Sequence, residues 1–223
     1  MPKEKQNTCF KVEKLSYEAD GKTILQDLDF QIFAGERVNL RGASGSGKST
    51  LLQLLALLLK PSSGHIEYQG KDLESWPYTT YRQAVSYCHQ TPRLFGESIF
   101  DNLAFPSQIR QKKFDADRAR ALLADVRLEQ FDLRQGIDRL SGGERQRLAL
   151  IRHLMFPPEV LLLDEVTTGL DAKTAAIIWT WLFKVAEEEN LTLIWVSHDE
   201  TEQRRADRFL TIQNGHMEVA THA

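Results

Sequence analysis

The chain has 223 residues, of which 42% are hydrophobic and 26% charged, a length and balance typical of one large globular domain or two small lobes. Its 28 lysines and arginines against 31 aspartates and glutamates give a formal net charge of -3. This balance argues against an electrostatic nucleic-acid binder, so we expect no nucleic-acid partner. Cys9 and Cys88 lack the spacing of a metal site or a disulfide framework, and we expect reduced thiols in the cytosol.

The most apolar tract, residues 51–59, is much shorter than the roughly 20 residues that a helix needs to cross a bilayer. We interpret this tract as a buried helix. The N-terminal segment 1–7 is charged and lacks the apolar centre of a signal peptide. Work at a membrane would therefore require a second polypeptide that supplies the spans.

The first part of the chain predicts strands. Residues 10–15 and 28–33 alternate apolar and polar side chains, and an Asp20-Gly21 turn signal lies between them. We expect these segments to form a half-buried antiparallel pair. Residues 37–41 then predict a strand that leads through a glycine-rich loop into the leucine-rich helix.

The stretch 98–135 turns helical and polar, with apolar residues at helical spacing, and predicts a small helical lobe. Continuous apolar strands at 160–163 and 191–196 then flank a helix at 172–189, which indicates a parallel sheet buried on both faces. An Asn-Gly pair between 209–213 and 216–219 predicts a hairpin at a sheet edge. We predict a single domain over 1–223 with a helical insertion at approximately 92–150. The apolar positions of the lobe are Ala116, Ala119, Leu122, Leu123 and Val126.

Residues 42–49 fit the pattern of a phosphate-binding loop, in which glycines let backbone N–H groups approach phosphates and the following helix adds its positive end. In this interpretation Lys48 neutralises the outer phosphates, Ser49 places its hydroxyl on Mg²⁺, and Thr50 supports the phosphates. The alternative is a plain glycine-rich turn. The pattern alone does not separate kinases, GTPases and transporter ATPases. The loop consists of Gly42, Ala43, Ser44, Gly45, Ser46, Gly47, Lys48 and Ser49.

Two acids, Asp164 and Glu165, follow an apolar strand at the end where ligands bind in open α/β sheets. Asp164 is predicted to hold Mg²⁺. Glu165 is the natural general base for the attacking water, because hydrolysis needs a carboxylate that the metal does not occupy. The alternative is a strand-ending turn that contains two acids by chance.

Residues 140–147, Leu-Ser-Gly-Gly-Glu-Arg-Gln-Arg, closely resemble the signature of ABC ATPases. In physical terms, Ser141 predicts a helix N-cap, Gly142 and Gly143 leave backbone N–H groups bare, and a helix over 144–155 directs its positive end at an anion. A simple helix cap explains the serine but not the glycine pair.

The resemblance covers almost the whole chain. It implies the ABC ATPase fold, an α/β phosphate-loop core with a mostly parallel sheet, antiparallel N-terminal strands and an inserted α-helical subdomain. It implies that Tyr17 stacks on adenine, that Gln90 touches Mg²⁺ and water, and that His198 contacts the terminal phosphate. It also implies that Asp171 lies in a loop between two protomers. Each of these residues also has a plain alternative. Tyr17 could be an ordinary strand aromatic, Gln90 an exposed loop glutamine and His198 an incidental histidine. Asp171 could be a helix cap.

In this family the signature loop contacts ATP held by the phosphate loop of the opposite subunit. The resemblance therefore implies a homodimer with ATP and Mg²⁺ as cofactors, in which Ser141, Gly142, Gly143 and Glu144 bind ATP in trans. It also implies a separate transmembrane permease and a peripheral place on the cytoplasmic face of the inner membrane. Segment 91–99 is expected to expose Leu94, Phe95 and Ile99 to that permease. Alternatively, these three side chains cover the core of the lobe.

Segments 85–92, 101–106 and 108–110 look most like a compact bacterial ABC ATPase branch assigned to iron export. Two other functions remain as alternatives. A soluble ABC ATPase acting on DNA or ribosomes usually carries long coiled-coil insertions or two ATPase cassettes. The sequence 1–223 contains neither feature. A small-molecule kinase leaves the signature loop and His198 unexplained. The sequence thus favours an ATP-hydrolysing transporter subunit.

Overall fold

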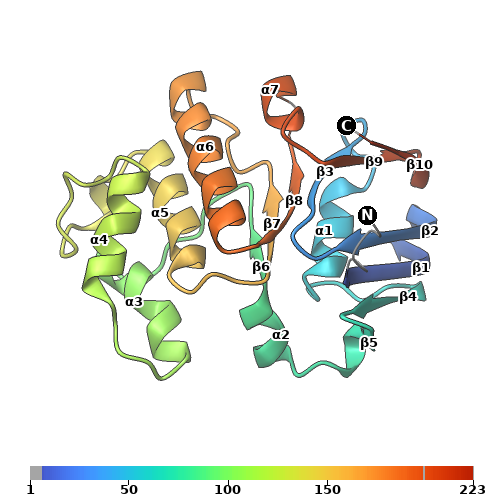
Figure 1. Ribbon diagram of the computed structural model, residues 1–223, viewed down its shortest axis with the longest axis horizontal. Coiled ribbons are helices and arrows are strands. Elements are labelled where there is room, and N and C mark those ends of the chain that lie inside the picture. Colours follow the sequence, from blue (N-terminus) through green and yellow to red (C-terminus); the bar gives the residue numbers. More distant parts are fainter. Residues whose placement is uncertain (1–6, 198, 223) are drawn as a thin grey trace, which may run out of the picture.

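The computed structural model describes residues 7–197 and 199–222, and their strands form two sheets with helices packed around them (Figure 1). The strands are β1 Thr8–Ala19, β2 Lys22–Phe33, β3 Arg37–Arg41, β4 Ser63–Tyr68, β5 Lys71–Asp72, β6 Val85–Cys88, β7 Val160–Asp164, β8 Thr192–Val196, β9 Arg208–Gln213 and β10 His216–His222. The helices are α1 Lys48–Leu55, α2 Tyr78–Ala84, α3 Ile99–Ile109, α4 Ala116–Asp125, α5 Gly142–Leu154, α6 Ala172–Glu188 and α7 Glu200–Gln203, with single 3₁₀ turns at Leu73–Ser75 and Ile137–Arg139.

The larger sheet has the strand order β10-β9-β3-β8-β7-β6. Its strands pair in parallel except for β10, which pairs antiparallel with β9 at the edge. Asn214 and Gly215 form the turn between these two strands with φ values of 51° and 80°, in the left-handed region that a two-residue hairpin turn requires. The predicted mostly parallel sheet and the predicted edge hairpin are both confirmed.

The smaller sheet has the order β2-β1-β4-β5 and contains the predicted antiparallel pair. Phe10 pairs with Ile32, as expected from the alternation, but both strands run further than predicted, up to the turn at Asp20 and Gly21. The φ values of these two turn residues are 51° and 71°, so the chain reverses in two residues and hydrogen bonding continues to the tip.

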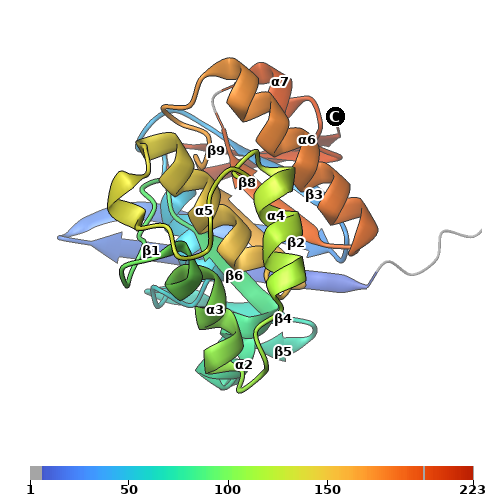
Figure 2. The same cartoon turned by 90° about the vertical axis from the view of Figure 1, so that its left-hand side faces the viewer.

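Alternate residues of the central strands point to opposite faces of the larger sheet. Val160 and Leu162 belong to an apolar cluster with β1, β2, β4 and α1, whereas Leu161 and Leu163 belong to one with α3, α4, α5 and α6. Figure 1 shows α1 on one side of β7 and β8 and α5 on the other, and Figure 2 shows the helices of the second cluster from their own side. The sheet therefore separates α1 from α5.

The interpretation of residues 51–59 as one buried helix is wrong in its second half. Helix α1 ends at Leu55, and Leu57 takes a left-handed φ of 54°. The N–H groups of Leu57 and Leu58 donate to the carbonyls of Leu54 and Gln53, the paired bonds that close a helix C-terminus. Leu58 is 43% exposed. None of the helices within 7–197 and 199–222 is long and apolar enough to span a membrane.

Helices α3, α4 and α5 lie between β6 and β7 in chain order, where the helical insertion is predicted. A reciprocal cap of Ser98 and Asp101 begins α3, and Asp115 caps α4. The predicted apolar positions of this lobe are buried from Ala119 onward, because α4 turns them toward α5 and the sheet. These positions are Ala119, Leu122, Leu123 and Val126.

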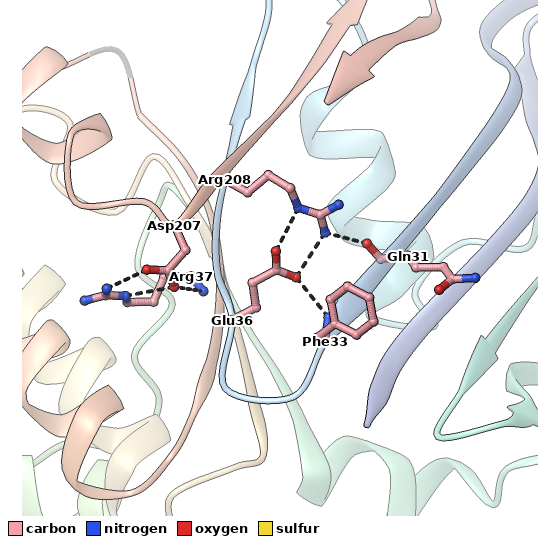
Figure 3. Close-up of polar contacts among 6 residues, drawn as sticks. All are labelled: Gln31, Phe33, Glu36, Arg37, Asp207 and Arg208. Carbon is pink, nitrogen blue, oxygen red and sulfur yellow. Dashed lines mark hydrogen bonds and ion pairs between the residues drawn. The ribbon is translucent and has the colours of Figure 1, made fainter. Parts of the chain in front are cut away.

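A mostly buried ion pair joins the two sheets at the start of β3 (Figure 3). Glu36 accepts hydrogen bonds from Arg208 Nε at 2.7 Å and Nη2 at 3.0 Å and from the Phe33 N–H at 2.9 Å. Arg208 Nη2 also donates to the Gln31 carbonyl at 2.5 Å. The side chains of Arg208 and Glu36 are only 13% and 14% exposed, so the end of β2 is fixed to the start of β9 in a low-dielectric setting.

Replacing Arg208 by methionine should lower the free energy of unfolding by about 3 kcal/mol, because the Glu36 carboxylate would stay mostly buried without its guanidinium. Arg37→Met is the matched control: its pair with Asp207 is 40% and 42% exposed, so the loss should be below about 1 kcal/mol. Urea unfolding of both variants measures the difference. Equal losses would contradict a special role for the buried pair.

Candidate functional site

The loop between β3 and α1 is built around glycines that no other residue can replace without strain. Gly42, Gly45 and Gly47 have φ values of 142°, 76° and 102°, which side chains disfavour. A Cβ at Gly42 would lie 2.2 Å from the Ile212 carbonyl oxygen, and one at Gly47 would lie 2.5 Å from Leu25 Cδ2. The loop is therefore pressed against β9 on one side and β2 on the other.

Lys48 folds back over this loop. Its Nζ donates to the carbonyl oxygens of Gly42 at 2.9 Å and Ala43 at 2.8 Å. Burial lowers the pKa of Lys48, and the acidic side chains at the end of β7 act in the opposite direction. The buried Ser46 Oγ has no hydrogen-bond partner among the described residues. The Lys48 ammonium, the N-terminus of α1 and the unpaired Ser46 hydroxyl can all bind phosphate oxygens.

Asp164, at the end of β7, lies against the first turn of α1. Ser49 Oγ donates to Asp164 Oδ1 at 2.9 Å, and the Tyr87 hydroxyl donates to Asp164 Oδ2 at 2.7 Å. The carboxylate residue is only 6% exposed. Hydroxyl and carboxylate oxygens are the ligands that Mg²⁺ prefers, so the pair that the sequence predicts for the metal fits it chemically.

Glu165 and Gln90 also come together. Gln90 Nε2 donates to Glu165 Oε2 at 3.0 Å, and Thr168 Oγ1 lies 3.4 Å from the same oxygen. The Glu165 N–H donates to the carbonyl of Val196 at 3.2 Å, which fixes this residue to the end of β8. The two predicted site residues thus meet next to Asp164, although Gln90 follows β6 and Glu165 follows β7.

Tyr17 lies one strand away from the phosphate loop. It is half-buried on β1 and pairs with Leu25 of β2, the side chain that packs against Gly47. Thr50 follows in the first turn of α1 and is half-buried. His198, which is predicted to contact the terminal phosphate, lies outside the described residues.

The signature loop, residues 141–143, begins α5. Ser141 Oγ accepts from the Glu144 N–H at 3.3 Å and the Ser141 N–H donates to Glu144 Oε2 at 2.7 Å, which confirms the predicted N-cap. Because the cap falls at Ser141, the helix begins at Gly142 rather than at Glu144. No atom of the described residues lies within 4 Å of a Cβ built on the exposed Gly142, and one on Gly143 would lie 3.0 Å from Leu170 Cδ2. The first turn of α5 is open on the Gly142 side.

Asp171 caps α6. Its Oδ1 accepts from the Thr174 N–H at 3.0 Å and its Oδ2 from Thr174 Oγ1 at 2.6 Å. These hydrogen bonds lower the pKa of the Asp171 carboxyl. The plain interpretation as a helix cap is confirmed, and a role between protomers stays a prediction.

Sequence reasoning missed two side chains beside this site. Tyr87 contacts Asp164 as described, and burial raises the pKa of its phenol, with a smaller contribution from Asp164, so it remains a hydrogen-bond donor. Glu202 of α7 is buried and accepts from Thr167 Oγ1 at 2.9 Å and from Ser197 Oγ, and burial raises its pKa. The sequence places Tyr87 in the short strand before Gln90, but no local pattern directs its hydroxyl to Asp164.

The predicted exposure of segment 91–99 is partly wrong. Ile99, the first residue of α3, is fully buried in the apolar cluster that includes α3, α4, α5 and α6, and Leu94 is half-buried against the same cluster. Phe95 is 38% exposed, as expected. The alternative interpretation, in which these side chains cover the core of the lobe, therefore holds for Leu94 and Ile99.

The exposed Phe95 lines a groove of 310 Å³ between α2, β6, α3 and α5. Phe105 and Ile109 of α3 extend its apolar wall and are 40% and 54% exposed. Its charged side chains are Arg82, Arg110 and Arg152, and none of the described residues that line it is acidic. The sequence gives no signal for this groove, because its wall comes from segments that are distant in the chain.

A phosphate loop between a strand and a helix, beside an acid-bearing strand of a parallel sheet, defines a phosphate-loop nucleotide-binding protein. Residues 25–168 match the family model described as ABC transporter, and the chain belongs to this family. It is an ATPase of the ABC type, and the predicted fold class is confirmed.

Two of the relatives match this chain over nearly their full length. The chain is 40% identical to the probable iron export ATP-binding protein FetA of Escherichia coli, covering 95% of both chains. It is 36% identical to the lipoprotein-releasing system ATP-binding protein LolD of Shewanella oneidensis, again over 95% of both. A solved structure with a TM-score of 0.85 and 26% identity is the dimeric post-hydrolysis state of the ATP-binding cassette MJ0796 bound to ADP and Pi, of which the chain covers 98%.

Gly42→Ala should lose stability and nucleotide affinity together. Its Cβ would overlap the Ile212 carbonyl, and overpacking of about 1–3 kcal/mol would add to the strain of the left-handed backbone. Gly45→Ala is the matched control, since no atom within residues 7–197 and 199–222 lies within 4 Å of its Cβ and backbone strain is the cost that applies. Thermal unfolding and titration with a fluorescent ATP analogue compare the two. A Gly42→Ala protein as stable as Gly45→Ala would disprove the close approach.

Proposed function

We propose that this ABC ATPase works as a homodimer that binds two ATP molecules between its subunits and drives a separate membrane permease. The observation that carries the proposal is the placement of the two glycine loops. The phosphate loop precedes α1 and the signature loop precedes α5, and these helices pack on opposite faces of the larger sheet. A second copy of the chain would bring its signature loop to the phosphate loop of the first.

In the proposed site the phosphate loop and Lys48 bind the phosphates of ATP, Thr50 supports them from the first turn of α1, and Tyr17 stacks on the adenine. Ser49 and Asp164 would hold Mg²⁺, which neutralises phosphate charge when bound. The signature loop and Glu144 of the second copy would cap the terminal phosphate with the N-terminus of α5, and Asp171 would lie at the subunit contact.

Glu165 is the proposed general base. Its carboxylate accepts a proton from water while the water oxygen attacks the terminal phosphorus, and ADP leaves. Gln90, which donates to Glu165 at 3.0 Å, holds one carboxylate oxygen in place and would contact the attacking water and the metal. His198 is assigned to the terminal phosphate from its position in the sequence alone.

Glu165→Gln should bind ATP with unchanged affinity, reduce phosphate release by at least about 100-fold, and accumulate as an ATP-bound dimer. The amide keeps the shape of the side chain and removes the base. Phosphate-release assays and size-exclusion chromatography with and without ATP measure these effects. Glu188→Gln on the exposed face of α6 is the control and should behave as wild type. Normal hydrolysis by Glu165→Gln would refute the assignment, and phosphate transfer to a small acceptor would favour the kinase alternative.

The permease would dock in the groove lined by Phe95, Phe105 and Ile109. An apolar wall of this exposure beside three arginines suits an apolar helix of a partner protein. The chain would then lie on the cytoplasmic face of the inner membrane as a peripheral subunit. The name of the relative with 40% identity supports iron export, whereas the relative with 36% identity is named for lipoprotein release, so the permease decides the cargo.

Phe105→Asp should abolish co-purification of the permease from detergent-solubilised membranes and leave ATP binding unchanged. Phe100→Asp is the control, because Phe100 lies on the same helix with 39% exposure, against 40% for Phe105, but outside the groove. Mass spectrometry of the co-purified membrane protein identifies the partner. Equal retention by both variants would exclude the groove as the docking site, and the absence of any membrane protein with the wild type would favour a soluble ABC ATPase.

A further inference from the structure

Tyr87 reaches from β6 to the carboxylate at the end of β7. The two strands are parallel, and Tyr87 pairs with Leu162, so its backbone lies below the level of Asp164. The long phenol spans this offset, and its hydroxyl donates to Asp164 Oδ2 at 2.7 Å. A phenylalanine at this position would keep the ring and leave that oxygen without the donor.

The two oxygens of Asp164 are held by two different elements. Ser49 of α1 donates to Oδ1 at 2.9 Å, and Tyr87 of β6 donates to Oδ2. Asp164 is 6% exposed, so bulk water has little access to either oxygen. The two donors on opposite oxygens fix the plane of the carboxylate, because rotation about the Cβ–Cγ bond would break both hydrogen bonds.

The ring of Tyr87 is itself held in place. It makes an edge-on contact with the His89 ring at 4.5 Å between centroids, and it lines the groove together with Ser86 and His153. Next to it, Ser86 Oγ lies 2.7 Å from His153 Nδ1, and burial lowers the pKa of His153 to about 3, which keeps that ring neutral. The His89 ring contact and the hydrogen bond to Asp164 therefore hold the phenol at both its ring and its hydroxyl.

We propose that Tyr87 is a positioning residue for Asp164: its hydroxyl holds Oδ2 so that Oδ1 stays directed at Ser49 and at the metal. This role rests on the proposed function, which assigns Asp164 to Mg²⁺. Residues that hydrogen-bond to metal ligands and orient them change metal affinity by about 10–100-fold when they are removed. Tyr87 itself touches neither the nucleotide nor the attacking water in this role.

The test measures metal binding separately from turnover. Mn²⁺ serves as the probe, and electron paramagnetic resonance follows its binding to the full chain in the presence of the non-hydrolysable analogue AMP-PNP. Tyr87→Phe should raise the dissociation constant for Mn²⁺ by about 10-fold. Binding of AMP-PNP in the presence of EDTA should stay unchanged, because the phosphate loop is intact. In ATPase assays of Tyr87→Phe, excess Mg²⁺ should restore the rate.

Ser86→Ala is the matched control. It removes one hydroxyl hydrogen bond from the neighbouring residue of the same strand without touching Asp164, so Mn²⁺ affinity should equal that of the wild type. An unchanged Mn²⁺ dissociation constant in Tyr87→Phe would overturn the proposal. Equal weakening in Ser86→Ala would also overturn it, since a general loosening of β6 would then explain both.

Asp164→Asn separates this proposal from the proposed function. If Asp164→Asn weakens Mn²⁺ binding and Tyr87→Phe does not, the metal assignment stands and the role of Tyr87 fails. If Asp164→Asn leaves Mn²⁺ binding unchanged, the metal assignment fails and the role of Tyr87 fails with it. Circular dichroism of each variant confirms that the fold is retained.

Discussion

The site depends on one fully buried strand, β7, which is hydrogen-bonded on both edges. All five of its residues, Val160–Asp164, are buried, and its neighbours β6 and β8 both run parallel to it. Alternate side chains of β7 enter the two apolar clusters, so neither face can slip without exposing core residues. The position of Asp164 is therefore fixed by the strand, and Ser49 of α1 and Tyr87 of β6 donate hydrogen bonds to its carboxylate there.

Features encoded in short segments were predictable from the sequence. The turns at Asp20-Gly21 and Asn214-Gly215 follow from the backbone angles that those residue types tolerate. The phosphate loop and the cap at Ser141 follow from local spacing in the same way. The strand that ends in Asp164 was also predictable, because a strand buried on both faces has a continuous apolar sequence.

Features that depend on register or on helix rotation were not predictable. The Tyr87–Asp164 and Thr167–Glu202 contacts join segments far apart in the chain, and no local pattern fixes their alignment. In α3 the sequence does not tell which apolar residues face outward, and packing decides that Ile99 is buried while Phe105 is exposed. A short apolar run likewise does not reveal that Leu57 turns left-handed.

The contact between Gly42 and the Ile212 carbonyl has a consequence for protein engineering. Because the nearest atom belongs to the main chain, no choice of side chain at 212 makes room beside the loop. Relief would require a movement of the whole β9–β10 hairpin, and the hydrogen bond from the Gln26 N–H to the Gly215 carbonyl, 2.8 Å long, ties that hairpin to β2. A tag or fusion that disturbs the hairpin would therefore alter the shape of the nucleotide loop, although the two are far apart in the chain.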